Sequence, residues 1–155
     1  MAPESPGARA LDHWDDRFLA LAAHIAEWSK DPSTKVGCVI ASPDRRVVST
    51  GFNGLPSGVE DSLERLTDRD LKYEMTVHAE RNAIISARRD LTGCRLYVTL
   101  RPCSVCAAMI IQAGIAEVIA PPCEDPRLFD SFHLDLTEQM LAEAGVALLT
   151  RSPED

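Results

Sequence analysis

The chain has 155 residues, 45% hydrophobic and 26% charged, which suits one compact domain with its own core and leaves no room for two. Acidic residues outnumber basic ones by 24 to 16, and the resulting net charge of −8 argues against a protein that tracks a long nucleic-acid backbone. No apolar run approaches the roughly 18 residues of a membrane span. The five cysteines, an odd number with no signal peptide before them, favour a reducing cytoplasmic location over a disulfide framework.

The first predicted element after a disordered tail is an amphipathic helix. Two prolines, a glycine and small side chains predict that residues 1–11 form the tail, before a single domain over 12–151. Apolar residues recur at steps of three and four over 12–28, which predicts a helix capped by Asp12 and ended before Pro32. The stripe expected to face the core is Trp14, Phe18, Leu21, Ile25 and Trp28.

A β-hairpin is predicted next, followed by alternating helices and strands. Two β-rich runs, 35–41 and 45–54, are joined by the turn sequence SPDR, and the charged stretch 60–75 predicts a short helix and a loop. Further helices are expected at 78–90, 102–115 and 135–145, and further strands at 95–100, 116–121 and 146–150. Because helices separate the later strands, these should pair in parallel. The predicted fold is therefore α/β, a three-layer α/β/α sandwich around a mixed sheet of about five strands.

Two short motifs predict a metal site. Cys103 and Cys106 form Pro-Cys-x-x-Cys at the start of a predicted helix, where positions i and i+3 share one face and the helix N-terminus favours thiolate. His78 starts another predicted helix 25 residues upstream. Three such ligands would hold a zinc ion and leave its fourth position open, as catalytic rather than structural zinc sites do.

Glu80 completes the pattern because it lies too close to His78 in sequence to chelate comfortably beside it. It is instead placed to reach the water on the metal and to carry protons, while zinc lowers the pKa of that water. Taken alone, Cys-x-x-Cys is also typical of a redox pair or half a structural zinc site, and His-x-Glu of a helix cap or a surface. Together they form H-x-E…P-C-x-x-C, the signature of zinc-dependent nucleobase deaminases.

Four segments carry a family resemblance: SKDPSTKVGCVI (29–40), GFNGLPSG (51–58), HAERNAI (78–84) and TLRPCSVCAAMIIQAGI (99–115). In this order they resemble the cytidine/deoxycytidylate deaminase superfamily and, within it, the deoxycytidylate (dCMP) deaminases. The zinc motif is specific for the superfamily, and the other segments point to the dCMP branch. The resemblance implies hydrolytic deamination of dCMP to dUMP, which feeds thymidylate synthesis.

The resemblance also implies roles for individual residues. His78, Cys103 and Cys106 bind zinc, and Glu80 protonates the ring N3, takes a proton from the water and protonates the departing ammonia. The backbone N–H of Ala79 holds the pyrimidine carbonyl. Asn53 hydrogen-bonds the deoxyribose, although an asparagine in a glycine-rich loop is also typical of a plain turn. Ser29 and Lys30 meet the 5′-phosphate; a dianion needs a cation, but Lys30 also fits a solvated surface position.

The same resemblance implies a homohexamer activated by dCTP and inhibited by dTTP, with magnesium, near the 51–58 loop. One zinc per chain is expected, since the stretch 55–77 holds no cysteine or histidine for a second site. The sequence departs from its relatives after the predicted strand at 116–121. Many of them carry a tyrosine-histidine pair there, where this chain has PPCEDPRLFDSF.

Three other functions therefore stay open at the level of sequence. The first is a deaminase of the same fold that acts on a free base or a nucleoside, such as cytosine, guanine or cytidine. The second is a binding module with a structural zinc, against which Glu80 argues, because such a site has no use for it. The third is an enzyme that edits RNA or DNA strands, against which the negative charge argues.

Overall fold

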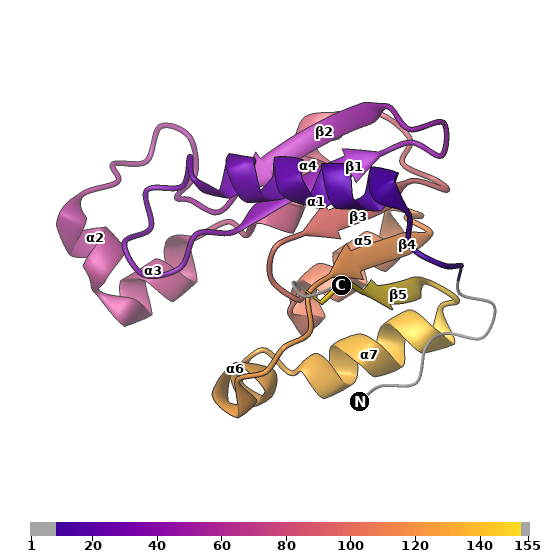
Figure 1. Cartoon of the computed structure of the whole chain (residues 1–155). Helices are drawn as coiled ribbons and strands as arrows, with labels where there is room; N and C mark the ends of the chain where they lie inside the picture. Colours follow the sequence, from indigo (N-terminus) through magenta and orange to yellow (C-terminus); the bar gives the residue numbers. More distant parts are fainter. Residues whose placement is uncertain (1–8, 153–155) are drawn as a thin grey trace.

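The computed structural model describes residues 9–152, and its centre is a five-stranded sheet with helices on both faces (Figure 1). The strand order is β2-β1-β3-β4-β5. The strands are β1 (Gly37–Ala41), β2 (Val47–Phe52), β3 (Arg95–Val98), β4 (Glu117–Ala120) and β5 (Ala147–Thr150). β1 is antiparallel to β2 and β3, whereas β3, β4 and β5 are parallel. The predicted hairpin and the parallel second half are both confirmed.

Helix α1 (His13–Ala26) covers one face of the sheet, and the other long helices cover the opposite face. Phe18 and Ala22 of α1 pack against the buried Tyr97 of β3. The opposite face is covered by α4 (Ala79–Ala87), α5 (Ser104–Gln112) and α7 (Leu134–Glu143). Side chains alternate between the two faces of a strand, so Leu96 and Val98 pack against this second layer. The predicted three-layer sandwich is confirmed.

The start of α1 agrees with the sequence, but its end does not. Asp12 caps the helix in a capping box with Asp15, as its side chain accepts hydrogen bonds from the first turn. Of the predicted stripe, Phe18 and Ile25 are buried. Trp28 was expected in the core and is 54% exposed. The helix ends at Ala26, so the chain leaves the helical period before Trp28 can continue the stripe.

Two glycines allow helices to approach the hairpin closely. A Cβ on Gly37 of β1 would lie against the Ala22 carbonyl of α1. A Cβ on Gly51 of β2 would lie 2.4 Å from the carbonyl oxygen of Ala79 and 2.5 Å from the backbone nitrogen of Ala83. Both positions therefore require glycine, because a helix backbone packs directly against the strand there. Gly51 allows α4 to lie close to β2.

Three short helices differ from the sequence prediction. The stretch 60–75 forms two consecutive helices, α2 (Leu63–Thr67) and α3 (Arg69–Met75), where one helix and a loop were expected. They lie together at one side of the sheet, on the left in Figure 1. An unpredicted helix, α6 (Pro126–Ser131), precedes α7. No residue of α3 or α6 is buried, so neither leaves an apolar stripe in the sequence, and both depend on capping aspartates.

The predicted tail, 1–11, lies mostly outside the described residues. Its described end contacts the domain: Arg9 forms paired hydrogen bonds of 2.7 Å with the buried Asp15 and also bonds Glu117 of β4. Cys38 and Cys94 are buried in the core, as predicted for structural thiols. Within 9–152, no helix is both long and apolar enough to cross a membrane.

Candidate active site

His78 is fixed at the N-terminus of α4 by backbone contacts on both sides. It is the N-cap residue, and its carbonyl accepts the N–H of Asn82 in the first helical turn. Val77 pairs with Gly54 through two backbone hydrogen bonds of 2.8 and 3.1 Å, which holds the 51–58 loop beside this helix start. The His78 side chain makes no capping bond, so it is available to point toward α5.

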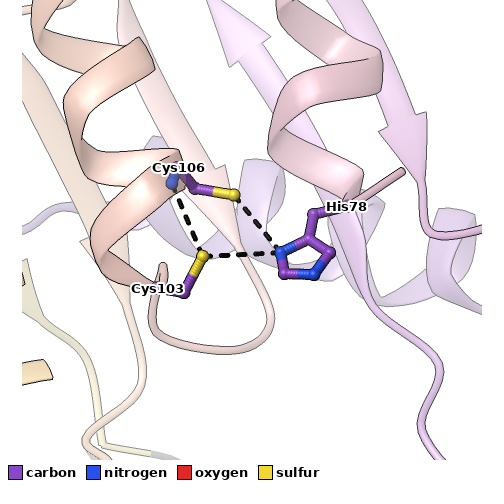
Figure 2. Close-up of side chains that lie close together, drawn as sticks. All are labelled: His78, Cys103 and Cys106. Atoms are coloured by element: carbon purple, nitrogen blue, oxygen red, sulfur yellow. Dashed lines mark hydrogen bonds between the residues drawn. The ribbon is translucent and has the colours of Figure 1, made fainter. Parts of the chain in front are cut away.

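The two cysteines lie at the N-terminus of α5, facing His78 (Figure 2). Cys103 is the N-cap, and its sulfur accepts the backbone N–H of Cys106 at 3.5 Å. The segment before it is held from α7, where the buried Thr137 hydroxyl donates to the Pro102 carbonyl at 3.0 Å. Two helix starts, distant in sequence, thus converge on one point.

The distances among the three side chains fit a zinc ion. The Nδ1 atom of His78 lies 3.6 Å from the Cys103 sulfur and 3.3 Å from the Cys106 sulfur. Zinc bonds of ~2.1 Å to nitrogen and ~2.3 Å to sulfur, at tetrahedral angles, place such atoms about 3.6 Å apart. All three donor atoms lie within 4.8 Å of one another. One histidine and two thiolates also form a donor set that suits zinc.

The local electrostatics favour a bound cation. A hydrogen bond from Cys106, followed by contacts with His78, lowers the pKa of Cys103 to about 3. The same hydrogen bond, together with burial, raises the pKa of Cys106. Both sulfurs lie at the N-terminus of α5, where the positive end of the helix dipole stabilises thiolate.

Arg81 is a functional residue that sequence reasoning missed. Its Nε donates to the Cys106 sulfur at 3.4 Å, and its Nη2 donates to the Cys103 sulfur at 3.9 Å. The guanidinium therefore partly neutralises the two ligand sulfurs from outside the ligand set, as outer partners of metal ligands do. Its position in the sequence could have indicated this contact, because Arg81 lies one helical turn, three residues, after the candidate ligand His78 on the same predicted helix.

Glu80 is buried beside the three candidate ligands, with 4% of its surface exposed. Burial, above all, raises the pKa of its carboxyl group. A carboxyl with a raised pKa both accepts and returns protons near neutral pH, as a general acid-base residue must. Glu80 lies in the first turn of α4, so the helix that carries His78 also positions Glu80.

A cavity of about 140 Å³ opens beside these residues. This is close to a volume that admits one benzene-sized ring. Five of the predicted site residues line it: Asn53, His78, Ala79, Glu80 and Cys103. Ala79 is the first residue of α4, where a backbone N–H has no acceptor within the helix. Leu128 and Phe132 make part of the lining apolar.

Asn53 both shapes the cavity and lines it. Its Oδ1 accepts the Val36 N–H at 2.8 Å, and its Nδ2 donates to the Thr34 carbonyl at 2.9 Å. These bonds hold the 29–36 loop in place, which is the structural role left open by the sequence. An amide nitrogen has two hydrogens, so one remains for a ligand.

The two residues expected at the phosphate do not line this cavity. The Ser29 hydroxyl is buried and donates to the Asn53 carbonyl at 2.8 Å. The Lys30 side chain is 72% exposed, and its ammonium pairs with Asp61 at 2.7 Å. Ser29 thus supports the Asn53 backbone, while Lys30 faces solvent.

Comparison with known proteins identifies the family. Residues 12–121 match the model of the cytidine and deoxycytidylate deaminase zinc-binding region. The chain belongs to this family. The resemblance read from the four sequence segments is thereby confirmed, and the convergence of His78, Cys103 and Cys106 agrees with a family of zinc-binding deaminases.

Two curated relatives and one solved structure illustrate the similarity. An uncharacterized deaminase in the luxG 3′ region of Aliivibrio fischeri is 46% identical over 137 residues, covering 88% of this chain and 92% of that protein. Mouse deoxycytidylate deaminase is 45% identical over 112 residues, covering 68% of this chain but only 63% of the mouse protein. The crystal structure of cyanophage S-TIM5 dCMP deaminase with dCMP and dUMP has the same fold, with a TM-score of 0.73 at 24% identity over 92% of this chain and 100% of that chain.

Proposed function

We propose that the protein is a zinc-dependent hydrolase that converts dCMP to dUMP and so supplies thymidylate synthesis. The observation that carries the proposal is the convergence of His78, Cys103 and Cys106 beside the buried Glu80, in a ring-sized cavity. Its support from comparison is the similarity to deoxycytidylate deaminases, one of which was crystallised with dCMP and dUMP.

In this proposal His78, Cys103 and Cys106 hold the metal. A zinc ion bound there lowers the pKa of water, so that a nucleophile is available at neutral pH. Glu80 takes one proton from the attacking water and passes it to ring N3. It then takes the second proton of that water from the new hydroxyl group on C4 and gives it to the amino group, so that the C4–N bond breaks, ammonia leaves and C4 keeps a carbonyl oxygen. Burial keeps competing water away from this carboxyl group and raises its pKa, which suits a residue that must hold and release a proton.

The substrate contacts follow from the cavity lining. The unpaired backbone N–H of Ala79 would donate to the pyrimidine carbonyl, and the remaining amide hydrogen of Asn53 would donate to the deoxyribose. The resemblance assigns the 5′-phosphate to Ser29 and Lys30. Neither side chain lines the cavity, so Ser29 and Lys30 can reach the phosphate only if the 29–36 loop moves. Otherwise another cation must bind the phosphate.

The proposal extends to assembly and control. We infer a cytoplasmic homohexamer that responds to dCTP and dTTP with Mg²⁺, on the ground of its resemblance to deoxycytidylate deaminases. The cytoplasm also keeps thiols reduced, which a pair of zinc-binding cysteines requires. Sedimentation of the zinc-loaded protein, with and without each nucleotide, tests the assembly, and initial rates with dCTP or dTTP test the control.

A deaminase of a free base or nucleoside is the second candidate. It is favoured by the apolar part of the cavity lining that Leu128 and Phe132 contribute. These two residues belong to the segment that lacks the tyrosine-histidine pair of many relatives. A binding module without catalysis would have no use for a buried carboxyl group at 4% exposure beside the metal ligands.

Ammonia release from dCMP, CMP, deoxycytidine, cytosine and guanine, measured side by side, tests the proposal. Preference for dCMP that is lost in Glu80→Ala, with zinc content unchanged, supports it. Turnover of only a base or nucleoside replaces it with the second candidate. No turnover by a zinc-loaded protein refutes a deaminase function.

A further inference from the structure

The cavity is lined by two basic side chains that the sequence did not assign to substrate, Lys72 and Arg101. Lys72 belongs to α3 and Arg101 lies two residues before Cys103. Lys30, by contrast, is exposed and paired with Asp61 outside the lining. Because a phosphate dianion needs a cation within contact distance, these two residues are the candidates within the described part of the chain.

Arg101 lies deep in the protein and has anionic and hydroxyl partners of its own. Its side chain is 7% exposed, its Nη2 donates to the Thr150 hydroxyl at 2.8 Å, and its Nη1 lies 3.7 Å from a Glu138 carboxylate oxygen. Its guanidinium is thus already held by a carboxylate and a hydroxyl group, and in the sequence it lies two residues before the candidate ligand Cys103. In a cytosine nucleotide the amino group, which must reach the metal ligands, lies at the opposite end of the molecule from the phosphate.

Lys72, by contrast, lies among side chains that suit a phosphate. Its ammonium donates to the Ser33 hydroxyl at 2.7 Å and to the Asp31 carboxylate at 3.3 Å, with 17% of the side chain exposed. An ammonium has three donors, so these two contacts leave one for a ligand. The surrounding lining is rich in hydroxyl groups, contributed by Ser33, Thr34, Tyr73 and Thr76.

Asp31 holds the Lys72 ammonium in place but leaves one of its N–H groups free to bind a ligand. Its Oδ1 accepts the backbone N–H groups of Ser33 and Thr34 at 2.9 and 3.1 Å, as well as the Ser33 hydroxyl. This one oxygen therefore shapes the loop and holds the ammonium from one side. A lysine restrained in this way loses less side-chain entropy on meeting a phosphate than an exposed lysine does.

We propose that Lys72, rather than Lys30, is the cation that meets the 5′-phosphate, and that it sets the preference for a nucleotide over the matching nucleoside. This inference rests on the proposed deaminase function and assigns its phosphate contact. Lys72 is a specificity residue in this proposal, because it contacts the part of the substrate that does not react.

The test compares kcat/KM for dCMP and deoxycytidine in four zinc-loaded proteins: wild type, Lys72→Met, Lys72→Arg and Lys30→Met. Loss of one charged hydrogen bond should lower kcat/KM for dCMP by about 10- to 100-fold in Lys72→Met. Turnover of deoxycytidine should stay within about twofold, because the nucleoside has no phosphate. Lys72→Arg should recover most of the dCMP activity, and Lys30→Met should keep the wild-type preference.

Equal losses for both substrates in Lys72→Met, or a loss of preference in Lys30→Met instead, would overturn the inference while leaving the deaminase function intact. A binding measurement tests the phosphate contact of Lys72 separately from the deaminase function. Calorimetric titration of dCMP into Glu80→Gln, with and without Lys72→Met, reports the phosphate contact without turnover. Wild type that binds dCMP through Lys72 but releases no ammonia would refute the proposed function alone. Thermal unfolding of each variant verifies that the fold is retained.

Discussion

Replacing Gly51 by alanine should damage both the stability and the catalytic site, through a contact that lies beneath α4. The new Cβ would stand 2.4 Å from the Ala79 carbonyl oxygen and 2.5 Å from the Ala83 backbone nitrogen. Ordinary contacts are ~3.5 Å, so α4 must move away from β2 by about 1 Å. Both neighbours are backbone atoms, and no side-chain rotation can relieve the clash.

The magnitude follows from the size of this displacement. Overpacking of a core contact costs about 1–3 kcal/mol, and a backbone clash belongs at the upper end of that range. For a chain of this size, ~3 kcal/mol corresponds to a Tm lower by roughly 6–12 °C. Because α4 carries Glu80 and begins at His78, a shift of ~1 Å should also lower kcat/KM by about 100-fold.

Gly54→Ala is the matched control, three residues further along the chain and just beyond the end of β2. A Cβ on Gly54 would meet no heavy atom within 4 Å, and its backbone is not in the left-handed region. That variant should be as stable as wild type or gain ~0.4–1 kcal/mol, because alanine has fewer unfolded conformations. Thermal unfolding and dCMP turnover are measured on both variants. Equal Tm values and equal rates would refute the account of Gly51 as the spacer beneath α4.

Three further changes test other parts of the structure. Glu80→Gln should lower kcat by roughly 10²- to 10⁴-fold while zinc content, measured by metal analysis, stays at wild-type level; loss of zinc would show that Glu80 holds the site together instead. Arg81→Met should weaken zinc retention by about 10- to 100-fold in a chelator competition, because the two sulfurs lose their hydrogen-bond donor, and unchanged retention would contradict that role. Asp15→Asn should cost roughly 3 kcal/mol at pH 7, since Arg9 then loses a buried partner. Burial alone would raise the pKa of Asp15, but hydrogen bonds from Arg9, the backbone and Tyr97 hold it well below its usual range. The wild-type advantage over this variant should therefore be complete above pH ~5 and shrink progressively as the pH falls below the ordinary range of an aspartate, and a urea-unfolding gap that is unchanged from pH ~7 down to pH ~2 would contradict it.

The main elements of the fold could be predicted because each leaves a local pattern. The stripe over 12–28, the β-rich runs and the glycines after α5 and α7 indicated which segments form helices and strands. The exceptions have a physical reason. α3 and α6 bury no residue, so their sequences carry no apolar period, and Trp28 follows the apolar spacing but lies beyond the end of α1. Local spacing cannot tell where packing stops a helix.

The sequence by itself determined which residues are the candidate zinc ligands and the candidate acid-base residue, because His78, Glu80, Cys103 and Cys106 belong to two short motifs at helix starts. Helix geometry brings Cys103 and Cys106 to one face, and only the approach of His78 required the fold. The tertiary structure alone decided which side chains line the cavity. Lys72, Arg101 and Phe132 come from α3, the loop between β3 and α5, and the segment after α6, far apart in the chain. It also turned Lys30 outward to Asp61. A cavity is lined by whichever segments long-range packing brings together, and no spacing along the chain records that.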